Sequence, residues 1–138
     1  MNAECRMQNA QFDLKRRTKA FALATVRLVE SLPRGRTADV VGRQLLRAGT
    51  SVGANYRAAC RARSRKEFIA KMGIVLEEAD EAEFWLELVS DTGLLVATRV
   101  AVVREEAHQL VAIAVSSINT ARKARAPIQH SAFSILNS

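Results

Sequence analysis

The sequence predicts an all-α protein in which four long helices form an antiparallel, up-down-up-down bundle over residues 12–125. Hydrophobic residues make up 49% of the 138 residues, and many are Ala and Leu, which favour helices. Only two prolines and six glycines occur, too few for the many turns of an all-β fold. Four segments repeat apolar residues at helical spacing, and short connections join them. A chain of this length can bury a hydrophobic core as one domain.

The first helix is expected from about Phe12 to Leu32, and residues 1–11 are expected to form a flexible N-terminus. Pro33 ends this helix, because proline lacks an amide donor and restricts the residue before it. The second helix is expected from about Thr37 to Ala62. The inward-facing positions predicted for the two helices are Leu14, Thr18, Phe21, Thr25, Leu28 and Leu32, and Val41, Leu45, Ala48, Val52, Asn55 and Ala59.

The third helix is expected to open at Ser64. Glu67 follows this serine by three residues, the capping-box spacing in which each side chain bonds a free backbone amide. Gly93 suits the left-handed residue just past the end of a helix. The fourth helix is expected from about Ala97 to Arg125, followed by a C-terminal tail over residues 126–138. The predicted inward positions are Phe68, Met72, Val75, Ala79, Ala82 and Leu86, and Val100, Val103, Ala107, Val111, Ala114, Ile118 and Ala121.

Charge is distributed unevenly along the chain, whose formal net charge is +7. Residues 1–66 hold fifteen Lys and Arg residues against four acids, whereas residues 67–91 hold one against eight. The third helix is therefore acidic and its neighbours are basic. A positive net charge makes polyanions candidate partners. The same split also suits packing between helices or between subunits.

Basic residues line one face of the second helix. At 100° per residue, four of them fall opposite the apolar stripe and three follow in the next turn: Arg43, Arg47, Arg57 and Arg61, then Arg63, Arg65 and Lys66. Arginine binds phosphate with paired hydrogen bonds, so such a row could follow a nucleic-acid backbone with little regard to sequence. In the alternative, this face pairs with the acidic third helix of its own or a neighbouring subunit. Tyr56 is the one aromatic residue here that could stack on a base.

Gly42, Gly49 and Gly53 lie along one flank of the second helix. A glycine inside a helix costs about 1 kcal/mol relative to alanine, so three on one side indicate that another backbone approaches closely. The approaching backbone belongs either to the same bundle or to another subunit. Asn55, beside the inner stripe, is expected to be buried and hydrogen-bonded.

Apolar residues also occur away from the inner stripe of the third helix. A helix that is apolar on most sides is usually buried on more than one side. Another copy of the chain is the simplest extra partner. We therefore expect a homo-oligomer whose interface includes four residues of this helix: Ile74, Phe84, Trp85 and Leu88.

The sequence shows no residue pattern that would support catalysis or metal binding. Cys5 and Cys60 are isolated, and His108 and His130 are the only histidines. The acidic third helix lacks the Glu-x-x-His spacing of di-iron bundles. Ser51 has no neighbouring His or Lys in the sequence to activate it. We therefore expect a non-enzymatic protein without a metal or cofactor.

Neither a secretory signal nor a membrane span is predicted. Residues 1–17 lack the apolar segment of a signal peptide. The longest uncharged stretch of the helical region, residues 107–121, contains polar residues and falls short of the ~20 apolar residues that cross a bilayer. A cytoplasmic protein without a membrane partner is expected.

Residues 44–68, QLLRAGTSVGANYRAACRARSRKEF, resemble the signature of small four-helix-bundle proteins encoded within intervening sequences of 23S ribosomal RNA. The shared elements are Gln-Leu-x-Arg-Ala, then Ser-Val-x-x-Asn, and finally Arg-Ser-x-Lys-Glu-Phe. The resemblance covers about residues 12–120. The positions that match the motif are Arg47, Ser51, Asn55, Arg63, Ser64, Lys66 and Phe68.

The resemblance implies a four-helix bundle that assembles as a homopentameric ring. It also relates the chain to accessory proteins of diversity-generating retroelements, which share the fold and bind a reverse transcriptase and nucleic acid through basic surfaces. The chain departs from the family pattern at two places. Residues 56–59 replace an Ile-Ala-Glu-Gly segment, and Glu77 and Glu78 replace a Gly-Ser pair.

The sequence therefore predicts a non-enzymatic, oligomeric bundle that binds RNA or DNA backbone through the basic face of its second helix. The alternative is a structural or adaptor homo-oligomer without a nucleic-acid role. In that case the same arginines meet the acidic helix.

Overall fold

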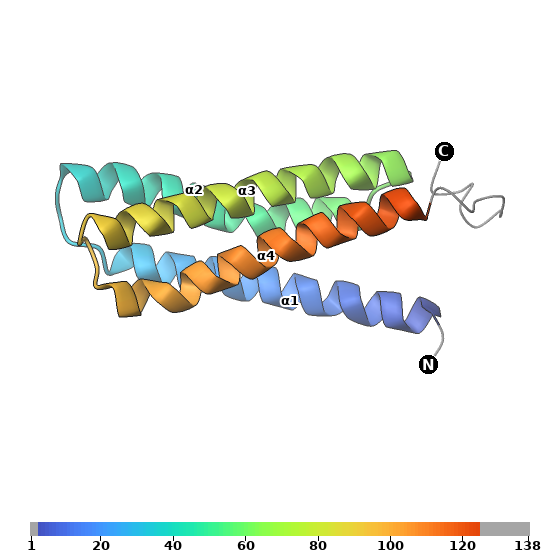
Figure 1. The fold of residues 1–138 in the computed structure, drawn as a ribbon, viewed down its shortest axis with the longest axis horizontal. Helices are drawn as coiled ribbons and strands as arrows, with labels where there is room; N and C mark the ends of the chain where they lie inside the picture. Colours follow the sequence, from blue (N-terminus) through green and yellow to red (C-terminus); the bar gives the residue numbers. More distant parts are fainter. Residues whose placement is uncertain (1–2, 125–138) are drawn as a thin grey trace.

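The computed structural model describes residues 3–124, with side chains from Asn9 onward. The described residues form four α-helices and no strand, which confirms the all-α bundle. The helices run alternately up and down and are joined by short turns (Figure 1). None of the described helices is long and apolar enough to cross a membrane. Their bounds are α1 Ala3–Glu30, α2 Arg36–Cys60, α3 Arg65–Asp91 and α4 Ala97–Lys123.

The observed helix bounds differ from the prediction mainly at the N-terminus. α1 begins at Ala3 rather than near Phe12, so most of the segment expected to be a flexible N-terminus is helical. α2 ends at Cys60 and α4 at Lys123, each slightly before the predicted end. The predicted C-terminal tail, residues 126–138, lies outside the described residues.

The start of α3 shows the predicted capping box with one difference. The Ser64 hydroxyl accepts a hydrogen bond from the Glu67 amide at 3.0 Å. The Glu67 carboxylate reaches one residue further back than expected and accepts from the Arg63 amide at 3.0 Å. Past the end of α3, Gly93 adopts a φ of 74°, the left-handed conformation that glycine favours.

The core runs along the bundle axis between the four helices. Most of the predicted inward positions are buried, among them Phe21, Leu45 and Leu86. On α4 the core takes Leu110, whereas the predicted Val111 is half-buried, because the spacing shortens from four residues to three at this turn. Burial of these stripes decides which faces of each helix remain in solvent.

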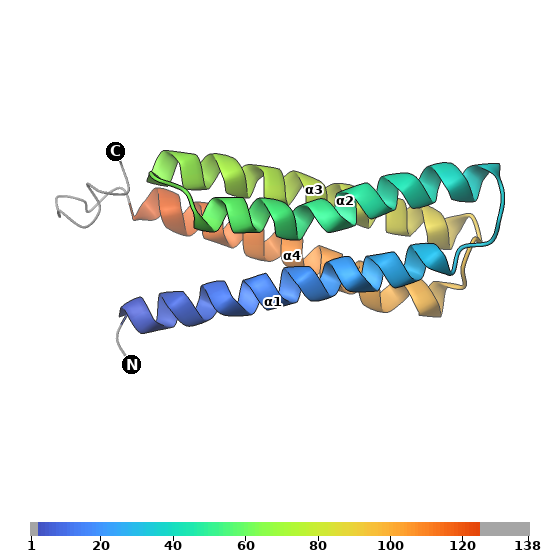
Figure 2. The same ribbon diagram turned by 180° about the vertical axis from the view of Figure 1, so that it is seen from behind.

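α1 and α2 pack closely because the glycine flank of α2 faces α1. A Cβ built at Gly49 would lie 2.6 Å from Cγ2 of Thr25, and one built at Gly53 would lie 3.3 Å from Oγ1 of Thr18. Both threonine hydroxyls bond back to α1 carbonyls at 2.8 Å. Figure 2 shows the two helices side by side. Of the two interpretations of the glycines, close packing within one bundle is therefore confirmed.

Arg17 joins α1 to α4. Its guanidinium donates two hydrogen bonds to the Glu106 carboxylate, at 2.7 and 2.9 Å, and one to Oε1 of Gln109 at 2.5 Å. The hydrogen bond with Glu106 raises the pKa of Arg17. Towards the N-terminus of α1 the two helices diverge (Figures 1 and 2). This ion pair is therefore a principal tie between the first and last helices.

Candidate nucleic-acid interface

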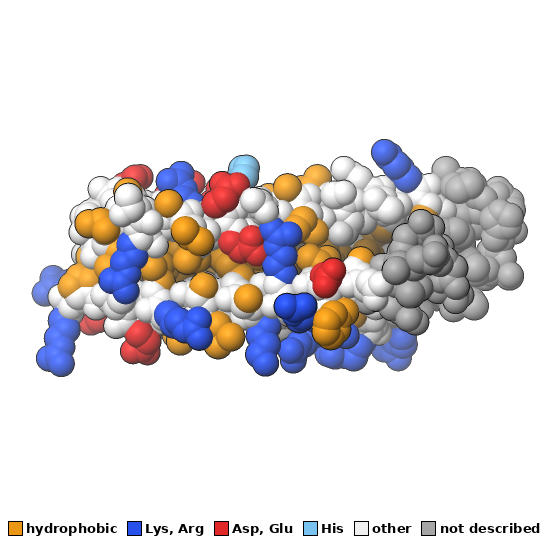
Figure 3. Space-filling model, turned by 90° about the horizontal axis from the view of Figure 1, so that it is seen from below, with side chains coloured by type: hydrophobic (Ala, Val, Ile, Leu, Met, Phe, Trp, Pro, Cys, Tyr) orange, Lys and Arg blue, Asp and Glu red, His pale blue; other side chains and the backbone are white. Residues whose placement is uncertain are grey.

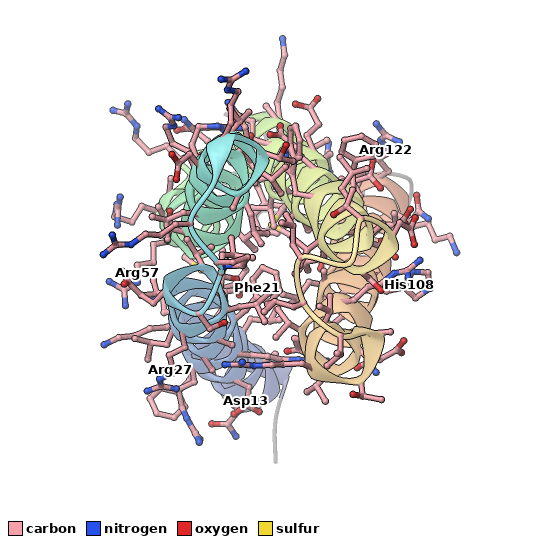
Figure 4. All side chains as sticks on the ribbon, turned by 90° about the vertical axis from the view of Figure 1, so that its left-hand side faces the viewer. Asp13, Phe21, Arg27, Arg57, His108 and Arg122 are labelled. Carbon is pink, nitrogen blue, oxygen red and sulfur yellow. The ribbon has the colours of Figure 1, made fainter. Side chains whose placement is uncertain are left out.

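The outer face of α2 carries the arginines that the sequence indicated. Arg43, Arg57 and Arg61 are exposed, and none of the three forms an ion pair with another described residue. Figure 4 shows Arg57 pointing away from the bundle on the side where α1 and α2 lie. These three guanidinium groups are therefore accessible to an anionic partner.

Arg47 behaves differently from the other arginines of α2. Its guanidinium donates to the Glu78 carboxylate at 3.1 Å and also pairs with Glu81 of α3. Trp85 donates its indole N–H to the same Glu81 carboxylate at 3.1 Å. The hydrogen bonds from Trp85 and Arg47 lower the pKa of Glu81. Arg47 therefore takes part in the contact between α2 and α3 of one chain, as the second interpretation of the stripe expected.

The three cations at the turn between α2 and α3 differ in their exposure to solvent. Arg63 and Lys66 are exposed, without an ion pair in the described residues. Arg65 is only 8% exposed, and its buried Nη1 has no hydrogen-bond partner. The physical reason is that Arg65 begins α3 two turns before Met72, on the stripe that faces the core. The structure therefore places Arg65 on the buried side of α3 and not among the exposed cations, whereas its contact with nucleic acid stays a prediction.

Two lysines of α1 extend the cationic surface, and the prediction from sequence omitted them. Thr18 packs against Gly53 and the helices are antiparallel, so Lys15 lies at about the level of Arg57. Lys15 and Lys19 are exposed, and neither is in an ion pair with a described side chain. Their spacing of four residues puts them on one face of the helix. That signal was visible in the sequence, but the register of α1 against α2 was not.

The exposed, unpaired cations of this side form a surface that we call the basic face. In Figure 3, Lys and Arg side chains crowd the edge of the molecule along α1. Near the end of α2, residues 9–19 and 57–71 contain only Asp13 and Glu67 as acids, and the Glu67 carboxylate accepts from the Arg63 amide. Arg43 lies about 21 Å further back along α2 than Arg57. The basic face consists of Lys15, Lys19, Arg43, Arg57, Arg61, Arg63 and Lys66.

Tyr56 is not part of the basic face. Its side chain belongs to the core and is 4% exposed. Burial, and to a lesser extent a hydrogen bond with the half-buried Cys60, raises the pKa of the Tyr56 hydroxyl. The ring on α2 that the sequence offered for base stacking is therefore inaccessible.

The motif residues of α2 that match the family bond along their own helix. Ser51 donates its hydroxyl to the Arg47 carbonyl at 2.6 Å, and Asn55 donates its amide to the Ser51 carbonyl at 2.8 Å. Asn55 is half-buried rather than buried, and its expected hydrogen bond is present. The polar groups of these side chains are therefore satisfied within α2, and neither residue belongs to the basic face.

The apolar residues predicted for an oligomer interface lie on α3. Ile74 is 37% exposed and Phe84 51% exposed, while Trp85 and Leu88 are half-buried. The rings of Phe84 and Trp85 meet edge to face, with centroids 5.1 Å apart. α3 thus presents apolar side chains to solvent on the side that also carries most of the acids.

A shallow hollow of about 430 Å³ opens between α3 and α4. It is lined by Glu83, Arg104 and His108 among others. His108 Nδ1 lies 3.1 Å from the Glu83 carboxylate, and Figure 4 shows His108 at the outer surface of α4. Within residues 9–124 no three His, Cys, Asp or Glu side chains gather as metal ligands would. Of its charged and titratable groups, Glu105 and His108 are exposed, whereas Glu83 and Arg104 are half-buried and Arg104 pairs with Glu87 outside the lining.

Comparison with known proteins places this bundle in a family. The model of the 23S rRNA-intervening sequence protein family matches residues 10–116. The chain therefore belongs to this family, as the sequence motif indicated. Comparison with curated proteins gives no match.

A solved structure supports the assignment. It is the crystal structure of a protein of unknown function from the S23 ribosomal protein family of Bacteroides thetaiotaomicron, which is 36% identical to this chain. The match covers 75% of this chain and 96% of the other, with a TM-score of 0.71. Identity at this level over most of the chain shows a shared fold as well as a shared family.

Proposed function

We propose that this protein is a non-enzymatic, oligomeric four-helix bundle that binds the backbone of RNA or DNA through its basic face. The observation that supports this function is the set of exposed, unpaired cations on two neighbouring helices, with Arg57 and Lys15 at the same level. Phosphates that are neutralised by such side chains release counterions, which favours binding without base readout. Buried Tyr56 agrees with a contact made mainly to the backbone.

We also propose that the protein assembles as a homo-oligomer, a pentamer as the family resemblance implies. Exposed apolar residues on α3 support this part of the proposal, because a second copy would remove Ile74 and Phe84 from water. A reverse transcriptase as protein partner, and a cytoplasmic location without membrane contact, follow from the resemblance and the sequence. Apart from Lys66 in the first turn of α3, the basic face lies on α1, α2 and the turn after α2, so assembly through Ile74 and Phe84 would leave it open.

One observation favours the rival function of a protein adaptor. Arg47 shows that an arginine of α2 pairs readily with the acids of α3. The same chemistry between subunits would use the basic face to hold an oligomer together. A charge reversal on this face would abolish nucleic-acid binding under the first function and would dissociate the oligomer under the second.

The test is an electrophoretic and anisotropy assay of structured RNA and duplex DNA at low salt, with light scattering on the same samples. Arg57→Glu/Arg61→Glu is compared with Arg34→Glu/Arg99→Glu, which makes an equal charge change at exposed sites at the opposite end of the bundle. We expect the first variant to lose affinity at unchanged oligomer mass, and the control to lose little. Loss of the oligomer without any wild-type affinity for nucleic acid would establish the adaptor instead.

A further inference from the structure

An exposed aromatic ring lies among cations on the outer side of α1. Phe12 is 60% exposed, the most exposed aromatic side chain of the described residues. The guanidinium carbon of Arg16 lies 5.8 Å from the ring centroid, as in a cation–π contact. Water hydrates a phenyl ring poorly, so this ring gains from any flat apolar partner that covers it.

The ring shares one helical face with three cations. Lys15, Arg16 and Lys19 follow Phe12 by three, four and seven residues, the spacing that brings side chains together along a helix. All three are exposed, and Lys15 lies at about the level of Arg57 on the neighbouring helix α2. A strand whose phosphates lie on these cations would therefore pass beside the ring.

Phosphate contacts next to an exposed aromatic ring are the combination that holds single-stranded nucleic acid, because every base has a face that can stack. In a continuous duplex the faces of the bases are already stacked on one another. We infer that Phe12 stacks on an unpaired base and that the basic face therefore selects single-stranded nucleic acid over an uninterrupted duplex. This inference rests on the proposed function and names the class of its ligand.

The inference is tested by fluorescence anisotropy with three labelled DNA ligands of one length. They are a single strand of mixed sequence, the same strand with abasic sites at its central nucleotides, and a blunt duplex. The abasic strand keeps every phosphate and removes only the bases that could stack. Phe12→Ala is the test variant, Phe12→Trp keeps an aromatic ring, and Val102→Ala removes an exposed apolar side chain of α4 as a control.

We expect wild-type protein to bind the intact strand about tenfold more tightly than the abasic strand at equal salt. Phe12→Ala is expected to lower affinity for the intact strand to the abasic value and to leave the abasic strand unaffected. Phe12→Trp and Val102→Ala keep the wild-type preference. Binding that depends on Arg57 and Arg61 but ignores the bases, or that favours the duplex, overturns the inference and leaves the proposed function standing.

Two further results are decisive. A change of oligomer mass in Phe12→Ala, measured by light scattering, would show that the ring is a contact between subunits and overturns the inference. Wild-type protein that binds none of the three ligands rejects both the inference and the proposed function.

Discussion

The α1–α2 side and the α3–α4 side of the bundle carry their charges in opposite ways. On the first side, exposed cations such as Arg57 and Lys15 form no ion pair with the described residues. On the second, the acids contact partners across helices: Arg104 forms an ion pair with Glu87 at 3.4 Å, and the His108 ring lies 3.1 Å from the Glu83 carboxylate. Whether a cationic side chain is free to bind a partner can therefore be judged only once the side chains of the adjacent helices are known.

Arg43 and Arg47 show this difference within one helix. They are four residues apart on α2, and both were predicted to bind nucleic acid. Arg47 pairs with Glu78 and Glu81 of α3, whereas Arg43 forms no ion pair with the described residues. Two arginines that look equivalent in the sequence therefore differ in ion pairing, because only one of them lies beside the acids of the neighbouring helix.

The largest expected effect follows from making the apolar side of α3 charged. Ile74→Glu/Phe84→Glu is expected to convert the proposed oligomer to monomer, because two carboxylates would have to be desolvated in the contact. Both side chains are exposed in the single chain, so helicity measured by circular dichroism is expected to persist. Light scattering gives the mass. Leu23→Glu, at an exposed apolar site of α1, is the control that leaves the mass unchanged.

A second prediction concerns the lysines of α1. Lys15→Glu/Lys19→Glu is expected to weaken binding of nucleic acid about tenfold or more at low salt, since two phosphate contacts turn repulsive. Arg34→Glu/Arg99→Glu, an equal charge change at exposed sites at the opposite end of the bundle, is expected to have a small effect. Anisotropy titrations at one salt concentration measure both. Equal losses in the two variants would mean that only net charge matters and that no basic face exists.

A third prediction tests the packing that brings α1 beside α2. A Cβ at Gly49 meets Thr25 at 2.6 Å, whereas one at Gly73 on α3 meets nothing within 4 Å. Gly49→Ala is therefore expected to lower the free energy of unfolding by about 1–2 kcal/mol, as overpacking outweighs the better helix propensity. Gly73→Ala is expected to raise it by about 1 kcal/mol. Urea denaturation measures both, and effects of the same sign would contradict the close approach of α1.

The smallest expected effect is the pH dependence of the Arg47–Glu81 pair. The pKa of Glu81 is lowered in the folded chain, by Trp85 and then by Arg47. Such a carboxyl contributes stability above its unfolded pKa, and the contribution is lost as pH falls through its folded pKa. Arg47→Ala is therefore expected to lower the melting temperature slightly at pH 7 and hardly at all at pH 3. A difference that grows at low pH would contradict the pairing.

Much of the fold was predictable from the sequence, because helical phase and helix ends are local properties. The stripe through Phe21 and the cap at Ser64 required only spacing along one helix. The beginning of α1 was missed because the prediction placed its first residues in a flexible segment. Leu110 was missed because two adjacent apolar residues on α4 both fit a helical stripe.

The candidate site was less predictable, because it depends on which helices are neighbours. The exposure of Arg57 could be predicted from the position of the apolar stripe of α2 alone. Burial of Arg65 depends on where α3 begins, and the neutralisation of Arg47 depends on α3 lying alongside α2. Lys15 joined the basic face only once α1 was placed against the glycine flank.

The central claim is that exposed cations of the basic face touch backbone phosphates, and the salt dependence of binding tests it most directly. The slope of log Kd against log salt counts these contacts, with about 0.7 for each phosphate on a single strand. We expect a clear slope for wild-type protein. Arg57→Gln/Arg61→Gln is expected to lower it by the share of two contacts, while Arg34→Gln/Arg99→Gln leaves it unchanged. A wild-type slope near zero, or equal slopes in all three proteins, would contradict the account.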